Sequence, residues 1–526
     1  MEIKCHAPPA RWSRLLFNGE ILRDYTVWFE GREEKATGVL DRPGLYEIVA
    51  RFDPTQASGQ MAISWENENN EPIFQHVISI PKDWKHPFPE TPYYFSVVVK
   101  GGVPGRTVIH STICLYEDKA ENLKALRAVQ MEATGTWREI PHDIYDSESW
   151  NDENLVKTEP YRYLPSVTFD LVAFPELDSN GDAVILCFCG SGDLVQKSGP
   201  TLQFRHREHL AFEIENEHWK VQTHAASGQI DSIYVKATGE SMEHHAEPEG
   251  TIHWNPDVYC PPTNWARCCE WNPPDSSTWQ SGAHSARIQR WGTMRFGIHQ
   301  VKVHITYWFY GPLAGIQQES VIHILERLAV KSLRNGEVVF NHSLFNGLIW
   351  EEPTGKTGEM RLEDARRHPE HGIHLNARCK WLGLTNWQTG TSFILVPVEM
   401  VKFCTEKGSA RLEAPYYYLA YGPWFYLSRA LVYPFGSNNP QRMVWLQPNS
   451  FYYEKNIFLP MRIQRDSSQL YHDVKEAVQP FRATPFVEIS MPTDPRVPDK
   501  WVEPLVEKPF RELPEHLVFI PGESSK

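Results

Sequence analysis

FEIENEHWKVQTHAASGQIDSIYVKATGE, residues 212–240, alternates apolar and polar residues in three short runs separated by turn residues. Successive side chains of a β-strand point to opposite faces, so this alternation predicts strands with one buried face and one wet face. Sheets with one wet face are commonly antiparallel, and Gly228 is the kind of residue that a tight connection between two strands favours. The stretch therefore predicts three consecutive antiparallel strands.

Strand-like runs of the same kind extend in both directions from this stretch. Between residues 201 and 463 they include QVKVHITYWFY, IQQESVIHILE and SFYYEKNIFLP, and between residues 28 and 116 they include GLYEIVARF and YYFSVVV. The 40 prolines and 32 glycines supply enough breakers to punctuate many short strands. The predicted fold class is all-β, with an N-terminal antiparallel β-sandwich over 1–118, a linker helix with connecting strands over 119–200, and a larger β-sandwich over 201–465.

Two short segments have a helical pattern instead. KAENLKALRAVQM, residues 119–131, places leucine and valine at helical spacing among charges, and SQLYHDVKEAVQPF, residues 468–481, opens the tail. The rest of the tail, up to residue 526, is rich in proline, which cannot donate a backbone hydrogen bond. We therefore expect the tail, 466–526, to wrap along another surface without regular β-ladders.

The charge balance excludes several classes of partner. The net charge is −14 and the pI is near 5.9, so no overall positive field attracts nucleic acid or an anionic membrane. The chain has no apolar span of 18 residues, and its first residues, MEIKCHAPPARWSRLLF, lack the apolar region of a signal sequence. We expect a cytoplasmic protein, or a secreted one if a signal peptide has been removed. The nine cysteines show no disulfide-framework spacing, which predicts reduced thiols.

Residues 212–240 resemble the opening of galactose-mutarotase-like supersandwich domains, in which two strands, a glycine-containing turn and a third strand lay out the sheet. CKWLGLTNWQTGTSFILV, residues 379–396, is similar to the strand pair found late in such domains. The resemblance covers about half the chain and implies a supersandwich-like domain over 201–465. It also implies carbohydrate chemistry, because mutarotases, sugar epimerases and accessory domains of polysaccharide lyases and glycosidases share this architecture.

PYYYLAYGPWFYLSRALVYP, residues 415–434, crowds aromatic residues around the single cation Arg429. Rings that carry hydroxyl groups, together with a guanidinium, can stack on a sugar and hydrogen-bond at its edges. We therefore predict catalytic roles for Tyr418 and Tyr421, and substrate contacts for Trp424 and Arg429. The alternative is that the rings pack between two sheets.

Residues 252–291 hold a dense cluster of polar and aromatic residues interrupted by five prolines. This composition predicts a long ordered loop, and such loops on rigid sheets usually carry binding and catalysis. From it we take His253 as a catalytic candidate and Trp254, Asn255 and Arg290 as substrate-binding candidates. The alternative is a structural Ω-loop held by its tryptophans.

FNHSLFNGLIW, residues 340–350, places Asn341 and His342 next to an apolar strand pattern. Elimination at a uronic acid needs a base of near-neutral pKa and a group that holds the carboxylate, and His, Tyr, Asn and Arg suit these roles. We take His342 as a catalytic candidate and Asn341 as a substrate-binding candidate. The alternative for His342 is a hydrogen-bonded internal histidine.

The leading hypothesis is a carbohydrate-active enzyme on an oligo- or polysaccharide, a lyase that eliminates across a uronic-acid linkage. His253 or His342 and a tyrosine from Tyr416 to Tyr421 would be base and acid. A cation or amide would hold the carboxylate, and the candidates for that role are Arg290, Arg429 and Asn341. The alternatives are a glycoside hydrolase or aldose epimerase, which need paired carboxylates or a histidine–carboxylate couple, and a non-catalytic glycan-binding protein.

No metal ion and no cofactor is expected. Three histidines recur at every third residue from His368 to His374, but Pro369 and Gly372 break a helix there, so the imidazoles do not converge by spacing. The sequence also lacks a P-loop, a dinucleotide fingerprint and a CxxC pair. The expected partner is a carbohydrate substrate, and the sequence predicts no oligomeric state.

Overall fold

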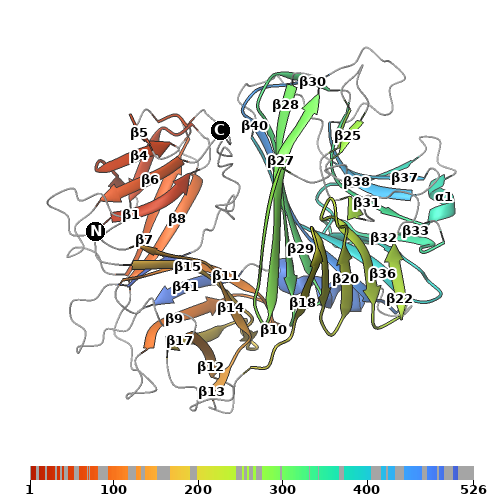
Figure 1. The fold of residues 1–526 in the computed structure, drawn as a ribbon, viewed down its shortest axis with the longest axis horizontal. Coiled ribbons are helices and arrows are strands. Elements are labelled where there is room, and N and C mark those ends of the chain that lie inside the picture. The colour runs from red at the N-terminus through yellow and green to blue at the C-terminus, as the bar shows by residue number, and fades with distance from the viewer. Residues whose placement is uncertain are drawn as a thin grey trace. The chain divides into compact units, whose positions relative to one another are not determined.

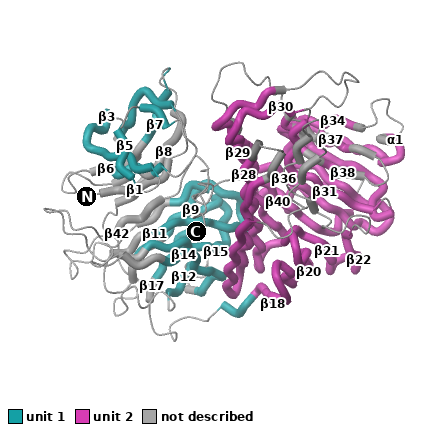
Figure 2. The backbone as a smooth tube through the Cα atoms, turned by 45° about the horizontal axis from the view of Figure 1, so that its top comes forward, with its two compact units in different colours: residues 1–200, 483–526 teal, residues 201–482 magenta. Residues whose placement is uncertain are grey.

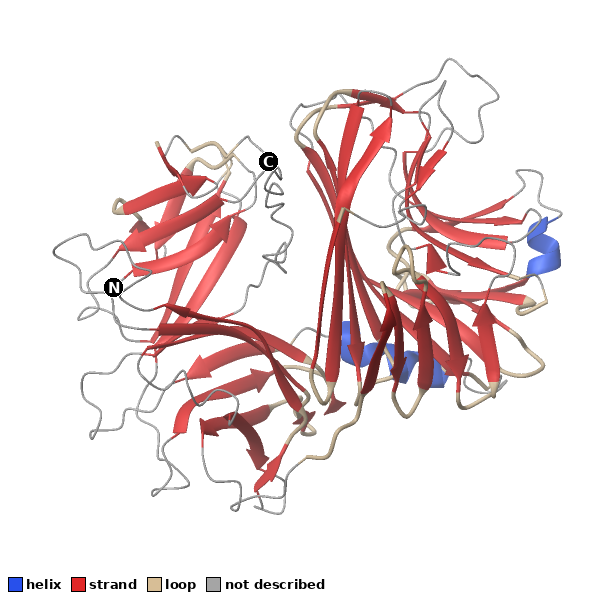
Figure 3. Ribbon diagram, in the orientation of Figure 1, coloured by secondary structure: helices blue, strands red, loops and turns tan. Residues whose placement is uncertain are grey.

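Nearly all regular structure in the computed structural model is β-strand (Figures 1 and 3), which confirms the predicted all-β fold class. The helices among the described residues are α1 (Leu362–Arg366) and α2 (His472–Arg482). None of the helices in the described ranges is long and apolar enough to cross a membrane. The structure describes residues 2–7, 11–17, 20–29, 32–35, 38–40, 46–51, 59–67, 69, 72–80, 93–116, 126–131, 137–150, 166–189, 198–243, 252–253, 257–259, 265–267, 275–296, 299–330, 332–341, 343–366, 372–403, 416–421, 425–432, 444–464, 471–482, 485–490 and 502–506.

The chain forms two compact units (Figure 2), unit 1 with residues 1–200 and 483–526 and unit 2 with residues 201–482. The largest sheet of unit 1 runs in the order β14 (His142–Trp150), β15 (Ser166–Ala173), β11 (Ile109–Tyr116), β42 (Val502–Val506), β8 (Pro72–Ile80), β7 (Gly59–Glu66), β2 (Arg14–Phe17) and β3 (Glu20–Ile21). A five-stranded sheet runs β13 (Trp137–Glu139), β12 (Leu126–Met131), β17 (Ala183–Cys189), β9 (Tyr93–Lys100) and β41 (Phe486–Ser490). Smaller sheets pair β1 (Glu2–Ala7), β6 (Tyr46–Arg51), β4 (Tyr25–Phe29) and β5 (Arg32–Glu34), and β10 (Gly105–Arg106) with β16 (Glu176–Leu177).

The core of unit 1 lies between its two larger sheets. Phe95 and Val97 of β9 meet Ile113 of β11 and Phe169 of β15, and all four side chains are fully buried. Packing of this kind between two antiparallel sheets is a β-sandwich. Strands before residue 118 therefore share their core with strands from 126–189.

Two expectations for unit 1 are wrong. Residues 126–131 of the predicted helix over 119–131 form β12, because pairing with β13 on one side and β17 on the other satisfies its backbone. Residues 117–125 lie outside the described residues. The tail, expected to avoid regular ladders, supplies β41 to β9, and β42 to β11 and β8, with Pro504 opposite Ile113. Proline removes one ladder donor and leaves the other bonds of the strand in place.

Unit 2 is built from two large sheets. The twelve-stranded sheet runs β18 (Gln203–Glu208), β19 (Ala211–Glu215), β20 (Trp219–Thr223), β21 (Ile230–Val235), β23 (Ile252–His253), β31 (Ser332–Phe340), β38 (Phe425–Val432), β37 (Tyr416–Tyr421) and β34 (Gly372–Asn376), with β22 (Glu240–Glu243), β24 (Asp257–Tyr259) and β25 (Trp265–Arg267) off this path. The nine-stranded sheet runs β26 (Ser276–Ser281), β27 (Ser285–Phe296), β28 (His299–Tyr310), β29 (Ile316–Ile324), β40 (Ser450–Arg462), β36 (Thr391–Phe403), β35 (Trp381–Thr385), β32 (Gly347–Glu351) and β33 (Thr357–Arg361). A small pair joins β30 (Leu328–Val330) to β39 (Val444–Leu446).

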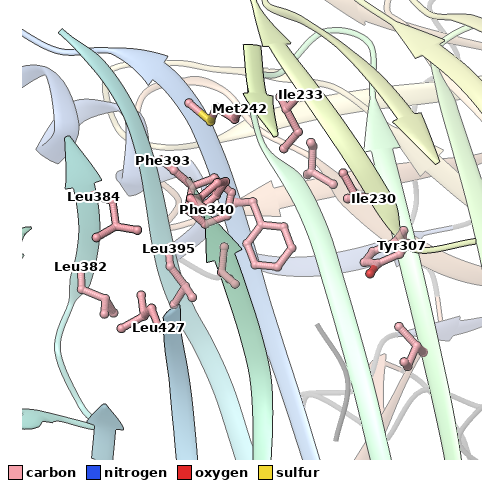
Figure 4. Close-up of a cluster of buried hydrophobic side chains, with 14 of the residues drawn as sticks. Ile230, Ile233, Met242, Tyr307, Phe340, Leu382, Leu384, Phe393, Leu395 and Leu427 are labelled. Atoms are coloured by element: carbon pink, nitrogen blue, oxygen red, sulfur yellow. The ribbon is translucent and has the colours of Figure 1, made fainter. Parts of the chain in front are cut away.

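The main core of unit 2 fills the space between these sheets. Ile230, Ile233 and Leu427 come from the twelve-stranded sheet, and Phe393 and Leu395 from the nine-stranded sheet (Figure 4). The alternation in β19 and β20 puts every second side chain into this core, as predicted, and β19, β20 and β21 pair antiparallel. In β21 the core residues Ile230 and Ile233 are three positions apart, because the pairing with β20 shifts register there.

The predicted glycine turn is confirmed at Gly228, between β20 and β21. Its φ of +68° lies in the left-handed region, and a Cβ there would meet Cδ of Arg290 at 2.8 Å. A larger residue would therefore strain the backbone and collide with a buried guanidinium.

The predicted helix over 468–481 is also confirmed, since α2 spans His472–Arg482. Its buried residues Val474 and Val478 pack against Ile394 of β36 and Leu459 of β40, on the face of the nine-stranded sheet opposite to the main core. The apolar stripe of α2 thus covers the β36 and β40 part of that face.

The long ordered loop predicted over 252–291 is wrong for the residues that the structure describes. They form β23, β24, β25, β26 and the first half of β27, and β27 pairs along its whole length with β28. The prolines fall between these strands, so they divide the segment into short strands instead of excluding strands.

Candidate functional site

A β-bulge in β31 places two charged residues side by side on the outer face of the twelve-stranded sheet, the face turned away from the core. Leu333 and Val338 are fully buried in the core, and the pairing with β38 shifts register between Asn335 and Val338. Gly336 has a φ of +66°, as one residue of such a bulge often does. The extra residue turns both Arg334 and Glu337 to the outer face.

Arg334 and Glu337 form an ion pair. Nη2 of Arg334 lies 2.7 Å from Oε2 of Glu337, and the two side chains are 6% and 7% exposed. A charge pair so far from water is stabilised by its own attraction and is costly to break on one side only. The bulge therefore holds a fixed carboxylate beside a fixed cation.

The backbone register brings several predicted residues into one row with Glu337. Position 253 of β23 lies directly opposite Glu337, and position 418 of β37 lies opposite Ser428 of β38 and His374 of β34. Arg429 pairs with Asn335 and Leu427 with Val338, so Ser428 stands opposite the bulge itself. His374, Tyr418, Ser428, Glu337 and His253 thus form one row across five neighbouring strands.

Spacing within this row follows from the geometry of sheets. Neighbouring strands lie about 4.7–4.9 Å apart, so positions 253 and 337 are one spacing apart and positions 418 and 337 are about 10 Å apart. Arg334 lies in the next row, opposite position 257 of β24, which is an aspartate. The positions of a histidine, two acidic residues, a tyrosine and an arginine therefore fall in two adjacent rows of this sheet.

The two predicted tyrosines do not share a face. Position 421 pairs with Phe425, which pairs with the fully buried core residue Phe340. Position 418 is three residues away and lies in the row of Glu337 instead. Of the two catalytic candidates in this segment, Tyr418 belongs to the candidate site.

Arg290, predicted to bind substrate, lies inside the sandwich with no exposed surface. Its Nη1 donates to the carbonyl oxygen of Ser227 at 2.6 Å and its Nη2 to Oε1 of Gln229 at 3.2 Å. The guanidinium also lies over the ring of Tyr307, 5.0 Å from the centroid. These contacts tie the β20–β21 turn to the nine-stranded sheet.

Arg429 is also interior, and 1% exposed. Its Nε donates to Oε1 of Glu454, its Nη1 donates to the carbonyl oxygen of Ala377 at 3.3 Å, and Asn335 donates from Nδ2 to Oε2 of the same glutamate at 2.6 Å. The cation that faces outward at this position of the sheet is Arg334.

The remaining predicted residues are placed as follows. Asn341 directly follows β31, is partly buried, and accepts a hydrogen bond on its carbonyl oxygen from the backbone N–H of Leu344 at 3.1 Å. His342, Trp254, Asn255 and Trp424 lie outside the described residues. The order of the chain puts His342 two residues beyond the end of β31.

Sequence reasoning missed Arg334 and Glu337. They occur in SLRNGEVVF, where an Asn-Gly pair interrupts an otherwise strand-like run. Glycine inside a strand pattern often marks a bulge, and a bulge changes which residues share a face. That interruption was the available signal.

The arrangement suits proton transfer. Carboxylates and histidines are the side chains that most often transfer protons in enzyme sites. Groups of three or more possible metal ligands are absent from the described residues. Cys187 and Cys379 are buried. Burial, with a smaller contribution from Glu352, raises the pKa of the Cys379 thiol to about 11, so that thiol stays protonated at neutral pH.

No family model matches this chain, and no curated protein matches it. Among solved structures, it is similar to a glycosyl hydrolase family 38 protein from Enterococcus faecalis (10% identity, 76% of this chain and 48% of that chain, TM-score 0.46) and to a galactose mutarotase-like protein from Lactobacillus casei (9% identity, 47% and 99%, TM-score 0.32). It is also similar to a family 36 alpha-galactosidase from Geobacillus stearothermophilus (10% identity, 52% and 42%, TM-score 0.30). The chain spans about half the length of the family 38 protein. At these identities the likeness concerns the fold alone.

Proposed function

We propose that the chain is a carbohydrate-active enzyme and that a sugar binds over the row from His253 to Tyr418. The observation that carries the proposal is the register of β23 on β31, which sets His253 directly opposite Glu337 while Arg334 holds that carboxylate at 2.7 Å. A histidine and a carboxylate at neighbouring positions can serve as acid and base on a sugar.

The reaction that this couple fits best is epimerisation at the anomeric carbon. Glu337 takes the proton of the anomeric hydroxyl while His253 gives a proton to the ring oxygen, so the C–O ring bond breaks and the open-chain aldehyde forms. Closure on the other face reverses both transfers. No net proton, electron or co-reactant is needed.

Elimination across a uronic-acid linkage is the second candidate, and the position of Tyr418 in the same row favours it. His253 or His342 would remove the proton, Tyr418 would protonate the leaving oxygen, and Asn341 would help to hold the carboxylate. Arg334 takes the cation role in this proposal, because Arg290 and Arg429 have interior partners. Glycoside hydrolysis would instead use Glu337 and Asp257 as the pair of carboxylates.

One set of assays separates these candidates. The purified protein is incubated with single anomers of common aldoses and followed by polarimetry, and with uronate polymers and neutral oligosaccharides. Faster mutarotation supports the epimerase, a new ultraviolet band of an unsaturated uronate supports the lyase, and new reducing ends support the hydrolase.

Glu337→Gln is the matched test of the site in whichever assay responds. Loss of turnover in this variant, with turnover kept in the surface variant Glu215→Gln, is the expected result. Sugar binding without turnover in any assay would leave a glycan-binding protein, and the absence of both binding and turnover would overturn the proposal.

A further inference from the structure

Directly behind the Arg334–Glu337 pair, a buried polar network crosses the core of unit 2. Asn335 sits between the two outward residues but faces inward, and its Nδ2 donates to Oγ of Ser320 at 2.8 Å and to Oε2 of Glu454 at 2.6 Å. Both acceptors belong to the nine-stranded sheet, where they lie directly opposite each other on β29 and β40. One side-chain amide thus joins the bulge of one sheet to two strands of the other.

The network is closed from the side by Arg429. It pairs with Asn335 across β38 and β31 and donates from Nε to Oε1 of Glu454. Each oxygen of Glu454 therefore has a donor, one from each of two neighbouring strands of the twelve-stranded sheet. All four residues are at most 1% exposed.

Such a network is costly in the interior of a protein, since buried polar groups cost free energy unless their partners are in place. The surrounding core positions, including Leu333, Val338 and Leu427, are aliphatic and fully buried. An aliphatic residue at position 335 would fill the same space without any need for partners. Asn335 stands between the two points where the pairing of β31 with β38 shifts register, which suggests a role in fixing that irregularity.

We propose that Asn335 is a positioning residue: through Glu454 and Ser320 it fixes the Gly336 bulge, and thereby the outward geometry of Arg334 and Glu337. A bulge can slide along a strand by one residue, and each such step exchanges the inward and outward faces of the residues it passes. With Asn335 held inward by two hydrogen bonds, Arg334 and Glu337 both face outward. The role of this geometry in catalysis rests on the proposed function, whereas the mechanical role of Asn335 does not.

The test compares two buried amides of unit 2. Asn335→Leu removes both hydrogen bonds of the Asn335 amide and leaves the Arg429–Glu454 contact in place. Asn456→Leu is the matched control, because Asn456 is fully buried on the same face of β40 as Glu454 and donates to Oε1 of Gln318 at 3.2 Å. Ser320→Ala is a milder variant that removes one acceptor and no charge. It keeps the test usable if Asn335→Leu does not fold.

The first readout is amide hydrogen exchange, which needs no substrate. Exchange in residues 332–341 relative to β28 should rise at least about tenfold in Asn335→Leu and by a smaller factor in Ser320→Ala, and stay within about twofold in Asn456→Leu, because only the first two loosen the bulge. Equal exchange of β31 in Asn335→Leu and Asn456→Leu would overturn the inference, whatever the enzyme does.

The second readout is turnover in the assay to which the wild-type protein responds. Asn335→Leu should lower kcat about 10- to 100-fold with KM changed less than about twofold, since small misplacements of catalytic groups act on the reaction step. A drop in kcat of the same size in Asn456→Leu would show a general structural effect and overturn the positioning role. If the wild-type protein turns over no sugar, the proposed function fails and the exchange comparison still decides the inference.

Discussion

Asn335 and Glu454 join the two large sheets of unit 2 through a hydrogen bond of 2.6 Å from Nδ2 to Oε2. The neighbouring residue Glu337 faces the opposite side of the same sheet, where it binds Arg334. The inner and outer contacts of β31 are thus separated by one glycine. A substitution on one face of β31 should therefore alter the contacts on the other face. The stability of the protein should be more sensitive to substitutions in the bulge than in the regular strands around it.

Replacing Arg334 by leucine should destabilise the protein by about 3–5 kcal/mol, because it leaves the buried carboxylate of Glu337 without its cation. The double variant Arg334→Leu/Glu337→Leu should recover most of this loss, since no charge then remains buried. Urea unfolding of the two single variants and the double variant measures the coupling. Additive single effects would contradict a direct ion pair.

Replacing Glu337 by glutamine should lower kcat about 100-fold or more, which is the usual contribution of a general acid or base. The substitution keeps the shape of the side chain but leaves the buried Arg334 guanidinium without its anion, so stability should fall as well, and kcat is compared at a temperature where both variants are folded. Glu213→Gln is a suitable comparison, because Glu213 carries ion pairs with Lys220 and Arg207 but lies far along the sheet on β19. Equal turnover in the two variants would remove Glu337 from the site.

Replacing Gly336 by alanine should cost about 1–2 kcal/mol of folding stability, because its φ of +66° is a conformation that a Cβ disfavours. Gly199→Ala is the control, since a Cβ there meets nothing within 4 Å and its φ is ordinary. The midpoint of urea unfolding should fall in the first variant and stay or rise slightly in the second. A neutral Gly336→Ala would mean that the bulge relaxes without cost.

Acid should weaken unit 1 through Glu139. Burial alone would raise the pKa of this carboxyl, but hydrogen bonds from Arg127 and from the backbone N–H of Ser198 outweigh it and the pKa is lowered below its usual value of 4.5. A lowered pKa in the folded state means that the ionised form stabilises folding above about pH 4.5 and that this stability is lost as the pH falls. Between pH 7 and pH 3, the free energy of unfolding should fall less steeply in Glu139→Gln than in the wild-type protein.

The control for that experiment is Glu176→Gln. Glu176 pairs with Arg106 through side chains that are 47% and 39% exposed, and exposed pairs contribute little to stability. The free energy of unfolding of Glu176→Gln should fall with pH as steeply as that of the wild-type protein. A matching decline in Glu139→Gln as well would show that another group governs the acid response.

Much of the fold could be read from the sequence because it depends on local alternation. The runs in residues 212–240 became β19, β20 and β21 with the expected pairing, and α2 formed where a helical stripe was visible. The segment 119–131 failed because a helical spacing of leucines also fits a strand once both neighbours are in place. Local pattern does not show which strands will be available as partners.

The candidate site was harder to predict for a related reason. His253 and Tyr418 were selected by residue type, and register then placed them in one row. Arg290 and Arg429 were selected by the same criterion, but their side chains and hydrogen-bond partners lie in the core. Residue type does not distinguish an arginine that faces outward from one that faces a buried glutamate, because that difference is set by the parity of the strand and by one bulge.

The C-terminal strands β41 and β42 complete two sheets whose other strands all precede residue 200. In the sequence, the whole of unit 2 lies between those earlier strands and β41. A ribosome therefore releases every strand of unit 2 before Ile489 can pair with Val97. The edge of β9 that pairs with β41 therefore stays unpaired while unit 2 is synthesised and folds, and an unpaired strand edge can bind other chains. Truncation before residue 486 should leave unit 2 foldable and unit 1 prone to aggregation, and an added peptide carrying residues 485–506 should counteract that aggregation.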